Sequence, residues 1–124
     1  MAVDAVAPRV LLVEDEPLIA MELEALVAEA GFEPIGPAAS CHAAFELIEA
    51  RKVDAAIIDY ILGDDVSDAL AAELCDRRIP WALTTGFDPA ILSGRFQTVP
   101  LIAKPFAEEE VRAVLAELLS DRTA

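Results

Sequence analysis

Short apolar runs alternate along the chain with longer segments of helical periodicity, and this alternation restricts the fold more than any other feature of the sequence. The apolar runs predict five strands, near residues 9–13, 32–35, 54–58, 81–84 and 100–103. Strands that are separated by helices form a parallel sheet covered by helices on both faces. We therefore expect a doubly wound α/β fold, with all 124 residues in a single domain.

The segments between the strands predict the helices. Residues 16–31, 40–50, 67–77 and the stretch after residue 105 have helical periodicity, and Ser40 is a suitable N-cap for the second of them. In the first helix Pro17 suits the first turn and Gly31 the C-cap. The apolar residues of this helix are Leu18, Met21, Leu23, Leu26 and Val27. The second helix is expected to bury Ala44, Leu47 and Ile48. The last helix is expected to bury Val111, Val114, Leu115 and Leu118. Between residues 87 and 99 a proline, a serine and a glycine interrupt any stripe, which predicts a short or mobile fourth helix.

Composition and charge exclude several classes of function. The 23 acidic and 9 basic residues give a formal charge of −14, which repels nucleic acids and anionic lipid surfaces. Cys41 and Cys75 lack the spacing of a metal site or a disulfide scaffold, and no apolar stretch approaches the roughly 20 residues that cross a bilayer. We expect a cytoplasmic protein that binds neither nucleic acid nor membrane.

Five polar residues stand where apolar runs end. Glu14 and Asp15 follow the first strand, Asp59 the third, Thr85 the fourth and Lys104 the last. In a doubly wound sheet the ligand site lies at the carboxyl ends of the strands, so these side chains are expected at one edge. Taken singly, each has an ordinary explanation as a helix-start acid, a turn residue or a solvated lysine. Their joint placement favours a phosphate and divalent-metal site instead.

The carboxylates of this set are suited to phosphoryl transfer and to Mg²⁺. A carboxylate can attack a phosphoryl group to form an acyl phosphate, and Asp59 is the candidate nucleophile. Mg²⁺ prefers a few hard oxygen ligands, so we expect Asp15 and Asp59 to bind it directly and Glu14 to act through water or indirectly. The backbone carbonyl of Ile61 is a further candidate ligand. Lys104 offers a point charge and Thr85 a hydroxyl to the phosphoryl oxygens.

The chain resembles the receiver domains of two-component response regulators over about residues 8–120. The resemblance rests on four segments in the family's order, namely Val13-Glu-Asp-Glu-Pro17, Ile57-Ile-Asp59, Thr85-Gly86 and Lys104-Pro-Phe106. It implies a flavodoxin-like sheet in the order 2-1-3-4-5. It also implies that the protein is a phospho-acceptor in signalling and not an enzyme.

The resemblance carries the family's roles to the same residues. It makes Glu14 and Asp15 the acidic pair, Asp59 the phospho-acceptor, Thr85 the switch hydroxyl and Lys104 the lysine that contacts phosphate. It further implies Mg²⁺, a sensor histidine kinase as donor, an unnamed downstream protein, slow self-dephosphorylation and a cis bond before the proline that follows the lysine.

Two positions depart from, or refine, the family pattern. Leu101 stands where the family usually has an aromatic residue that turns inward on activation. The segment at residues 80–87 is similar to the Pro-Phe-x-Phe-Ala-Thr-Gly-Tyr pattern of a receiver subgroup often paired with HWE or related histidine kinases. We therefore expect phosphorylation to order residues 87–99 around Thr85 instead of rotating an aromatic side chain.

Three functions remain open on the sequence. The preferred one is a stand-alone receiver that switches protein interactions or acts as a phosphate sink. The second is a phosphorylation-independent interaction module. The third is a phosphohydrolase of the haloacid-dehalogenase type. Such an enzyme requires a second acid two positions after its nucleophile, where this chain has Ile61. The leucines of the last helix fit either a phosphorylation-dependent dimer or a core stripe.

Overall fold

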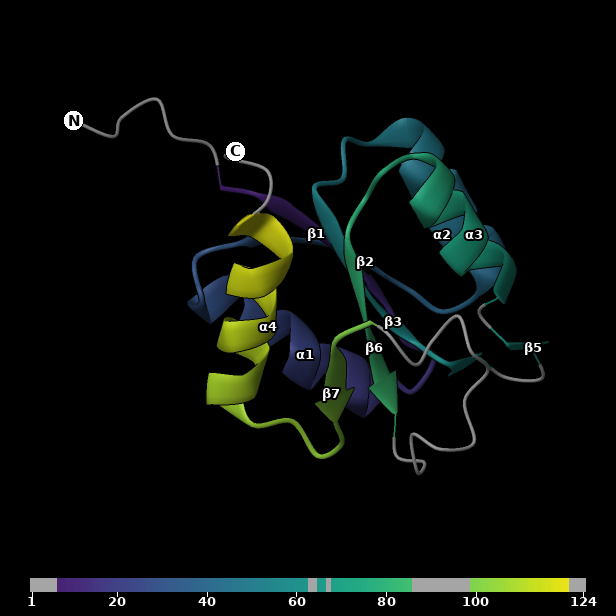
Figure 1. The fold of residues 1–124 in the computed structure, drawn as a ribbon. Coiled ribbons are helices and arrows are strands. Elements are labelled where there is room, and N and C mark those ends of the chain that lie inside the picture. The colour runs from purple at the N-terminus through teal and green to yellow at the C-terminus, as the bar shows by residue number, and fades with distance from the viewer. Residues whose placement is uncertain (1–6, 63–64, 67, 86–98, 121–124) are drawn as a thin grey trace.

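A five-stranded parallel sheet forms the centre of the molecule in a computed structural model that describes residues 7–62, 65–66, 68–85 and 99–120 (Figure 1). Its strands are β1 (Arg9–Val13), β2 (Glu33–Ala38), β3 (Ala55–Asp59), β6 (Trp81–Thr85) and β7 (Leu101–Ala103). They lie side by side in the order β2-β1-β3-β6-β7. Counted along the chain, this is the predicted 2-1-3-4-5 order of a flavodoxin-like receiver fold.

Helices cover both faces of the sheet (Figure 1). The described residues contain α1 (Pro17–Glu29), α2 (Cys41–Ala50), α3 (Asp68–Asp76) and α4 (Glu108–Ser120). In Figure 1, α2 and α3 lie on one side of the sheet and α1 and α4 on the other. The fourth helix expected between residues 87 and 99 falls outside the described residues.

The sheet has two apolar faces because side chains alternate along each strand. Leu11, Ile58 and Leu83 belong to the cluster that packs under α2 and α3. The strand residues next to them face the other way, toward α1 and α4: Val10, Leu12, Ile57, Ala82 and Ile102. A sheet that is buried on both sides explains why the strands read as nearly continuous apolar runs.

Local signals explain most of the helix boundaries. Pro17 occupies the first turn of α1, and Gly31, with φ of +99°, follows the end of that helix. The Ser40 hydroxyl accepts a hydrogen bond of 3.1 Å from the Ala43 amide and so caps α2. The first turn of α4 carries three glutamates, whose charge suits the helix dipole.

Helical periodicity predicts the buried residues of α4 better than those of α1. Val111, Val114, Leu115 and Leu118 of α4 are buried, as expected. In α1, Leu23 and Val27 are buried, but Leu18 and Met21 are 77% and 63% exposed. The latter two belong to the outer face of the helix, which periodicity alone does not reveal.

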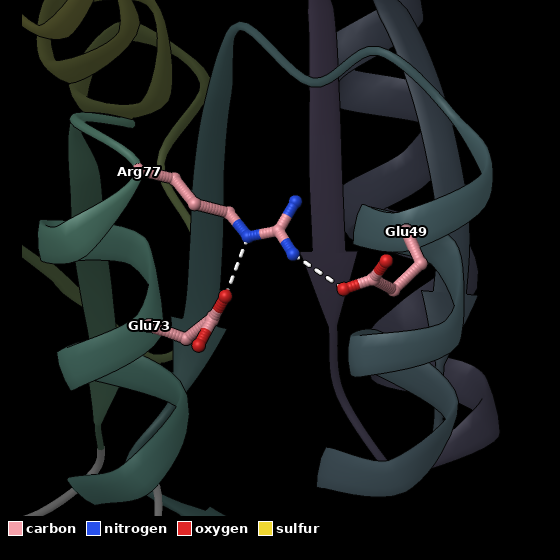
Figure 2. Close-up of polar contacts among 3 residues, drawn as sticks. All are labelled: Glu49, Glu73 and Arg77. Atoms are coloured by element: carbon pink, nitrogen blue, oxygen red, sulfur yellow. Dashed lines mark hydrogen bonds and ion pairs between the residues drawn. The ribbon is translucent and has the colours of Figure 1, made fainter.

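Three features were not predicted. β2 runs on to Ala38, past Gly36, whose φ is +98°. A small antiparallel hairpin of β4 (Ile61–Leu62) and β5 (Asp65–Val66) follows β3. An ion-pair bridge joins α2 to α3, because Arg77 contacts both Glu49 and Glu73 (Figure 2).

Within the described ranges, no helix is long and apolar enough to cross a bilayer.

Candidate functional site

Three carboxylates meet at the carboxyl edge of the sheet. Glu14 and Asp15 follow β1 and Asp59 ends β3, two strands that pair directly with Val13 opposite Ile58. One carboxylate oxygen from each of the three residues lies within 4.8 Å of the others. Glu14 and Asp59 are buried, whereas Asp15 is exposed and leaves the cluster accessible from solvent.

The main chain holds Glu14 in place. Its amide donates to the Ala38 carbonyl at 2.9 Å, which ties the end of β1 to the end of β2. Its carboxylate accepts a hydrogen bond of 3.1 Å from the Glu16 amide, at the start of α1. The Glu14 side chain is therefore fixed at the junction of a strand and a helix.

Lys104 joins the two buried carboxylates. Its Nζ lies 2.9 Å from Glu14 Oε1 and 2.9 Å from Asp59 Oδ2. Lys104 follows β7 at the far edge of the sheet, and the cis bond to Pro105, implied by the family resemblance, is present. The ammonium thus contacts two of the three carboxylates of the cluster and supplies one positive charge against them.

Burial and charge shift the pKa values of this pair. Burial raises the pKa of the Glu14 carboxyl above its ordinary value, and it outweighs the opposing hydrogen bonds from Lys104 and the Glu16 amide. Burial by itself lowers the pKa of Lys104, but the hydrogen bonds and the negative charges of Asp59 and Glu14 together outweigh it, so the net pKa is raised. Lys104 therefore stays charged at neutral pH.

The two remaining candidates are placed by their backbones. Thr85 ends β6 and pairs with Ala103 of β7, so its backbone lies at the same edge as the acidic cluster. Ile61 lies in β4, two residues after Asp59. The Thr85 side chain is outside the described part of the structure. Leu101, which replaces the usual aromatic, is half-buried against the cluster under α2 and α3.

Sequence reasoning assigned no role to Thr84, which lies directly opposite Asp59 in the sheet. It is 1% exposed, and its hydroxyl is one of the few buried polar side-chain groups in the described residues. A hydroxyl within an otherwise apolar strand was the available signal. It was missed because the neighbouring Thr85 matched the family motif.

The donor set fits a hard divalent cation. Three carboxylates within 4.8 Å repel one another, and Lys104 supplies a single positive charge against them. Mg²⁺ takes oxygen ligands from one or two carboxylates and retains waters, which the exposure of Asp15 permits. The residues present therefore suit Mg²⁺, with Asp15 and Asp59 as the direct candidates.

A parallel sheet in this order, with an acidic cluster and a lysine at its carboxyl edge, defines the class of receiver domains. No protein-family model matches the chain. Phyllosphere-induced regulator PhyR of Methylorubrum extorquens is 37% identical over 117 residues, which are 91% of this chain and 44% of PhyR. Transcriptional regulatory protein PdtaR of Mycobacterium tuberculosis is 36% identical over 109 residues, which are 84% of this chain and 53% of PdtaR. The chain thus spans about half the length of these curated relatives.

Solved structures extend the likeness over nearly whole chains. SdrG from Sphingomonas melonis Fr1 is 37% identical, with a TM-score of 0.81 over 91% of this chain and 97% of SdrG. A structure of the BeF3-activated conformation of SdrG is 36% identical, with a TM-score of 0.81 over 93% of this chain and 98% of the other. The chain belongs to the response regulator receiver family of two-component systems.

Proposed function

We propose that this chain is a receiver that accepts a phosphoryl group from a sensor histidine kinase on Asp59 in a Mg²⁺-dependent reaction. The observation that carries the proposal is the Asp59 carboxylate, held 2.9 Å from the Lys104 ammonium and clustered with Glu14 and Asp15 within 4.8 Å. A nucleophilic carboxylate, a cation site and a fixed ammonium are the parts that phosphoryl transfer to an aspartate needs.

The transfer is a simple displacement at phosphorus. A carboxylate oxygen of Asp59 attacks the phosphoryl group, a P–O bond forms, and the P–N bond to the donor histidine breaks. The electron pair of that bond stays on the imidazole nitrogen. When bound, Mg²⁺ would neutralise charge between the carboxylates and the phosphoryl oxygens.

This chain's own residues complete the charge balance. Lys104 turns from the Asp59 carboxylate to a phosphoryl oxygen, a move over a short path because its Nζ already lies against the acceptor. Thr85 offers a hydroxyl to another phosphoryl oxygen, and the Ile61 carbonyl is a further ligand for the cation. Slow hydrolysis of the acyl phosphate returns Asp59 to its starting state, so the protein signals without being an enzyme in the usual sense.

The relatives support this role and its partners. A BeF3-activated conformation is described for SdrG, and the chain covers 97% of the first SdrG structure, which supports a receiver that responds to a phosphoryl group. We infer a cytoplasmic location for this protein and a sensor histidine kinase of the HWE or a related type as donor. Phosphorylation either changes which protein this chain binds, which includes binding a second copy of itself, or removes phosphoryl groups from the kinase as a phosphate sink. The charge of −14 argues against nucleic acid as a direct partner.

Intact-protein mass spectrometry tests the acceptor. After incubation with acetyl phosphate and Mg²⁺, the wild type should gain one phosphoryl group, and Asp59→Asn should gain none. EDTA should abolish the gain. An adduct that persists in Asp59→Asn would place the acceptor elsewhere, and the absence of an adduct from both acetyl phosphate and a histidine-kinase donor would contradict the proposal.

Leu101 supports a second candidate, a phosphorylation-independent interaction module. This residue is a half-buried aliphatic where the family usually carries a switching aromatic. The affinity of the purified protein for a captured partner protein distinguishes the phosphorylation-dependent receiver from the phosphorylation-independent module. Affinity that is equal for wild type and Asp59→Asn, with and without acetyl phosphate, would favour the interaction module.

A further inference from the structure

A buried hydroxyl beside the acceptor has no role in the chemistry described so far. Thr84 is 1% exposed, and its Oγ1 has no hydrogen-bond partner among the residues that the structure describes. Burial of a hydroxyl without a partner costs free energy, and a valine of the same shape would avoid that cost. The strand therefore carries a polar group that its own packing does not require.

The register of the sheet shows which side this hydroxyl faces. Thr84 pairs with Asp59 of β3 on one side and with Ile102 of β7 on the other. Ala82, two residues earlier, belongs to the α1 and α4 cluster, as do Ile57 and Ile102. Because side chains alternate along a strand, Thr84 and Asp59 point to this same face.

Lys104 must cross the strand that bears Thr84. It follows β7, whereas its two carboxylate partners follow β1 and β3, and β6 lies between β7 and β3. The lysine side chain therefore spans the carboxyl end of β6 to reach them. A lysine ammonium has three N–H donors; Asp59 accepts a hydrogen bond from it, and Glu14 Oε1 lies 2.9 Å away as its ion-pair partner on a second side. One donor remains for an acceptor on the β6 side.

We propose that the Thr84 hydroxyl is this acceptor in the phosphorylated protein, and that Thr84 is a positioning residue for Lys104. The proposal deepens the proposed function and rests on it. When Asp59 carries the phosphoryl group, Lys104 moves to a phosphoryl oxygen while Glu14 keeps its contact. A hydrogen bond from the ammonium to Thr84 Oγ1 then fixes the lysine over the phosphoryl group. Thr84 stands where the similar subgroup pattern has alanine, so this would be a feature of the present chain.

The unphosphorylated and activated states should respond to Thr84→Val in opposite directions. Without ligand, the variant should have a higher thermal midpoint than the wild type, because the buried unpartnered hydroxyl is gone. With BeF3⁻ and Mg²⁺ as phosphoryl mimic, its affinity for BeF3⁻ should fall by about tenfold, the effect of one lost hydrogen bond to a charged donor. Thr84→Ser keeps the hydroxyl and should bind BeF3⁻ within about twofold of the wild type.

Two further readouts separate positioning from general damage. Mg²⁺ affinity without BeF3⁻ should be the same in wild type and Thr84→Val, because the carboxylates are unchanged. The Lys104 ammonium protons, followed by NMR in the BeF3⁻ complex, should exchange faster with water in Thr84→Val than in Thr84→Ser.

The outcomes distinguish this proposal from the function on which it rests. If the wild type fails to bind BeF3⁻ with Mg²⁺, the receiver function itself fails and the role of Thr84 falls with it. If the wild type binds and Thr84→Val binds equally well, the receiver function stands and the role of Thr84 is refuted. Equal loss in Thr84→Val and Thr84→Ser would also refute it, because the hydroxyl would not be the cause.

Discussion

The Glu14 carboxyl lies where burial opposes its negative charge. Its side chain is 1% exposed, and its pKa is raised by burial more than Lys104 and the Glu16 amide lower it. A carboxyl whose pKa is higher in the folded protein binds more protons there than in the unfolded chain. Its contribution to stability is full below the unfolded pKa of 4.5 and is lost as the pH rises through the folded value. Without metal, Glu14 therefore contributes less to stability as the pH rises above 4.5.

Substitution of Glu14 by glutamine should remove this pH dependence. In EDTA, Glu14→Gln should be more stable than the wild type at neutral pH, and the difference should shrink as the pH falls toward 4.5. Urea unfolding at a series of pH values measures both curves. Glu117→Gln, which removes an exposed charge near the end of α4, is the matched control and should shift the curve without this convergence. A difference that is constant with pH would show that Glu14 is not the group responsible.

At the scale of elements, the strands and the approximate site could be predicted because the inner strands β1 and β3 are almost entirely buried and read as apolar runs. An apolar run that ends at an acid or a lysine marks both the strand and its carboxyl end, as it does for Ile57-Ile58 and Asp59. The exposure of Leu18 and Met21 could not be predicted, because helical periodicity does not say which apolar residues meet the sheet. The place of Thr84 depends on strand register, which the sequence leaves open.

Other parts of the site depend on contacts between distant elements. Lys104 reaches Glu14 and Asp59 across the carboxyl end of β6, because the strand order places β6 between β7 and β3. Sequence spacing predicts a common edge but not which carboxylates share the ammonium. The irregular register of β1 and β2 near Gly36 and the Arg77 bridge are likewise contacts between elements, which the sequence does not reveal.

Gly36 is the glycine at which strand pairing depends on the missing side chain. Its φ is +98°, and a Cβ at this position would lie 2.7 Å from the Ala38 amide nitrogen and 3.0 Å from the Leu12 carbonyl oxygen. Gly36→Ala should cost about 3 kcal/mol of unfolding free energy, since strained backbone and backbone contact add. Gly31 has φ of +99° with open space around it, so Gly31→Ala should cost only about 1 kcal/mol. Equal costs in urea unfolding would show that the close approach to Leu12 is unimportant.

The bridge between α2 and α3 gives a second test at this scale (Figure 2). Arg77 Nε lies 2.5 Å from Glu73 and its Nη2 2.5 Å from Glu49, and its pKa is raised mainly by the hydrogen bond to Glu73. Arg77→Gln should lower the thermal midpoint at low salt and should speed hydrogen exchange in α2. Because exposed ion pairs are screened, the difference from wild type should shrink in about 1 M NaCl.

Arg78→Gln is the control for the Arg77 bridge, since it removes the same charge one residue later. Arg78 forms no ion pair with the residues whose contacts are described. It should change the midpoint less than Arg77→Gln does. If both variants lose the same stability, the effect belongs to net charge and not to the bridge between the helices.

At the scale of the whole molecule, a charge of −14 and the acidic cluster both attract cations, and the two effects can be separated. Any salt screens the general repulsion. Only a cation that binds the cluster stabilises the folded state by mass action, by about 1.4 kcal/mol when its concentration is roughly tenfold above the dissociation constant. Mg²⁺ should therefore raise the thermal midpoint beyond the increase caused by NaCl of equal ionic strength.

Asp15→Asn tests whether the excess stabilisation by Mg²⁺ comes from the cluster. Asp15 is its exposed member, and its substitution leaves the contacts of Lys104 with Glu14 and Asp59 in place. The variant should respond equally to MgCl₂ and to NaCl of the same ionic strength, whereas Glu117→Gln should keep the extra response. Thermal unfolding of the three proteins in both salts measures this. Excess stabilisation that survives in Asp15→Asn would mean that Mg²⁺ acts on the overall charge, and the proposed cation site would lose its support.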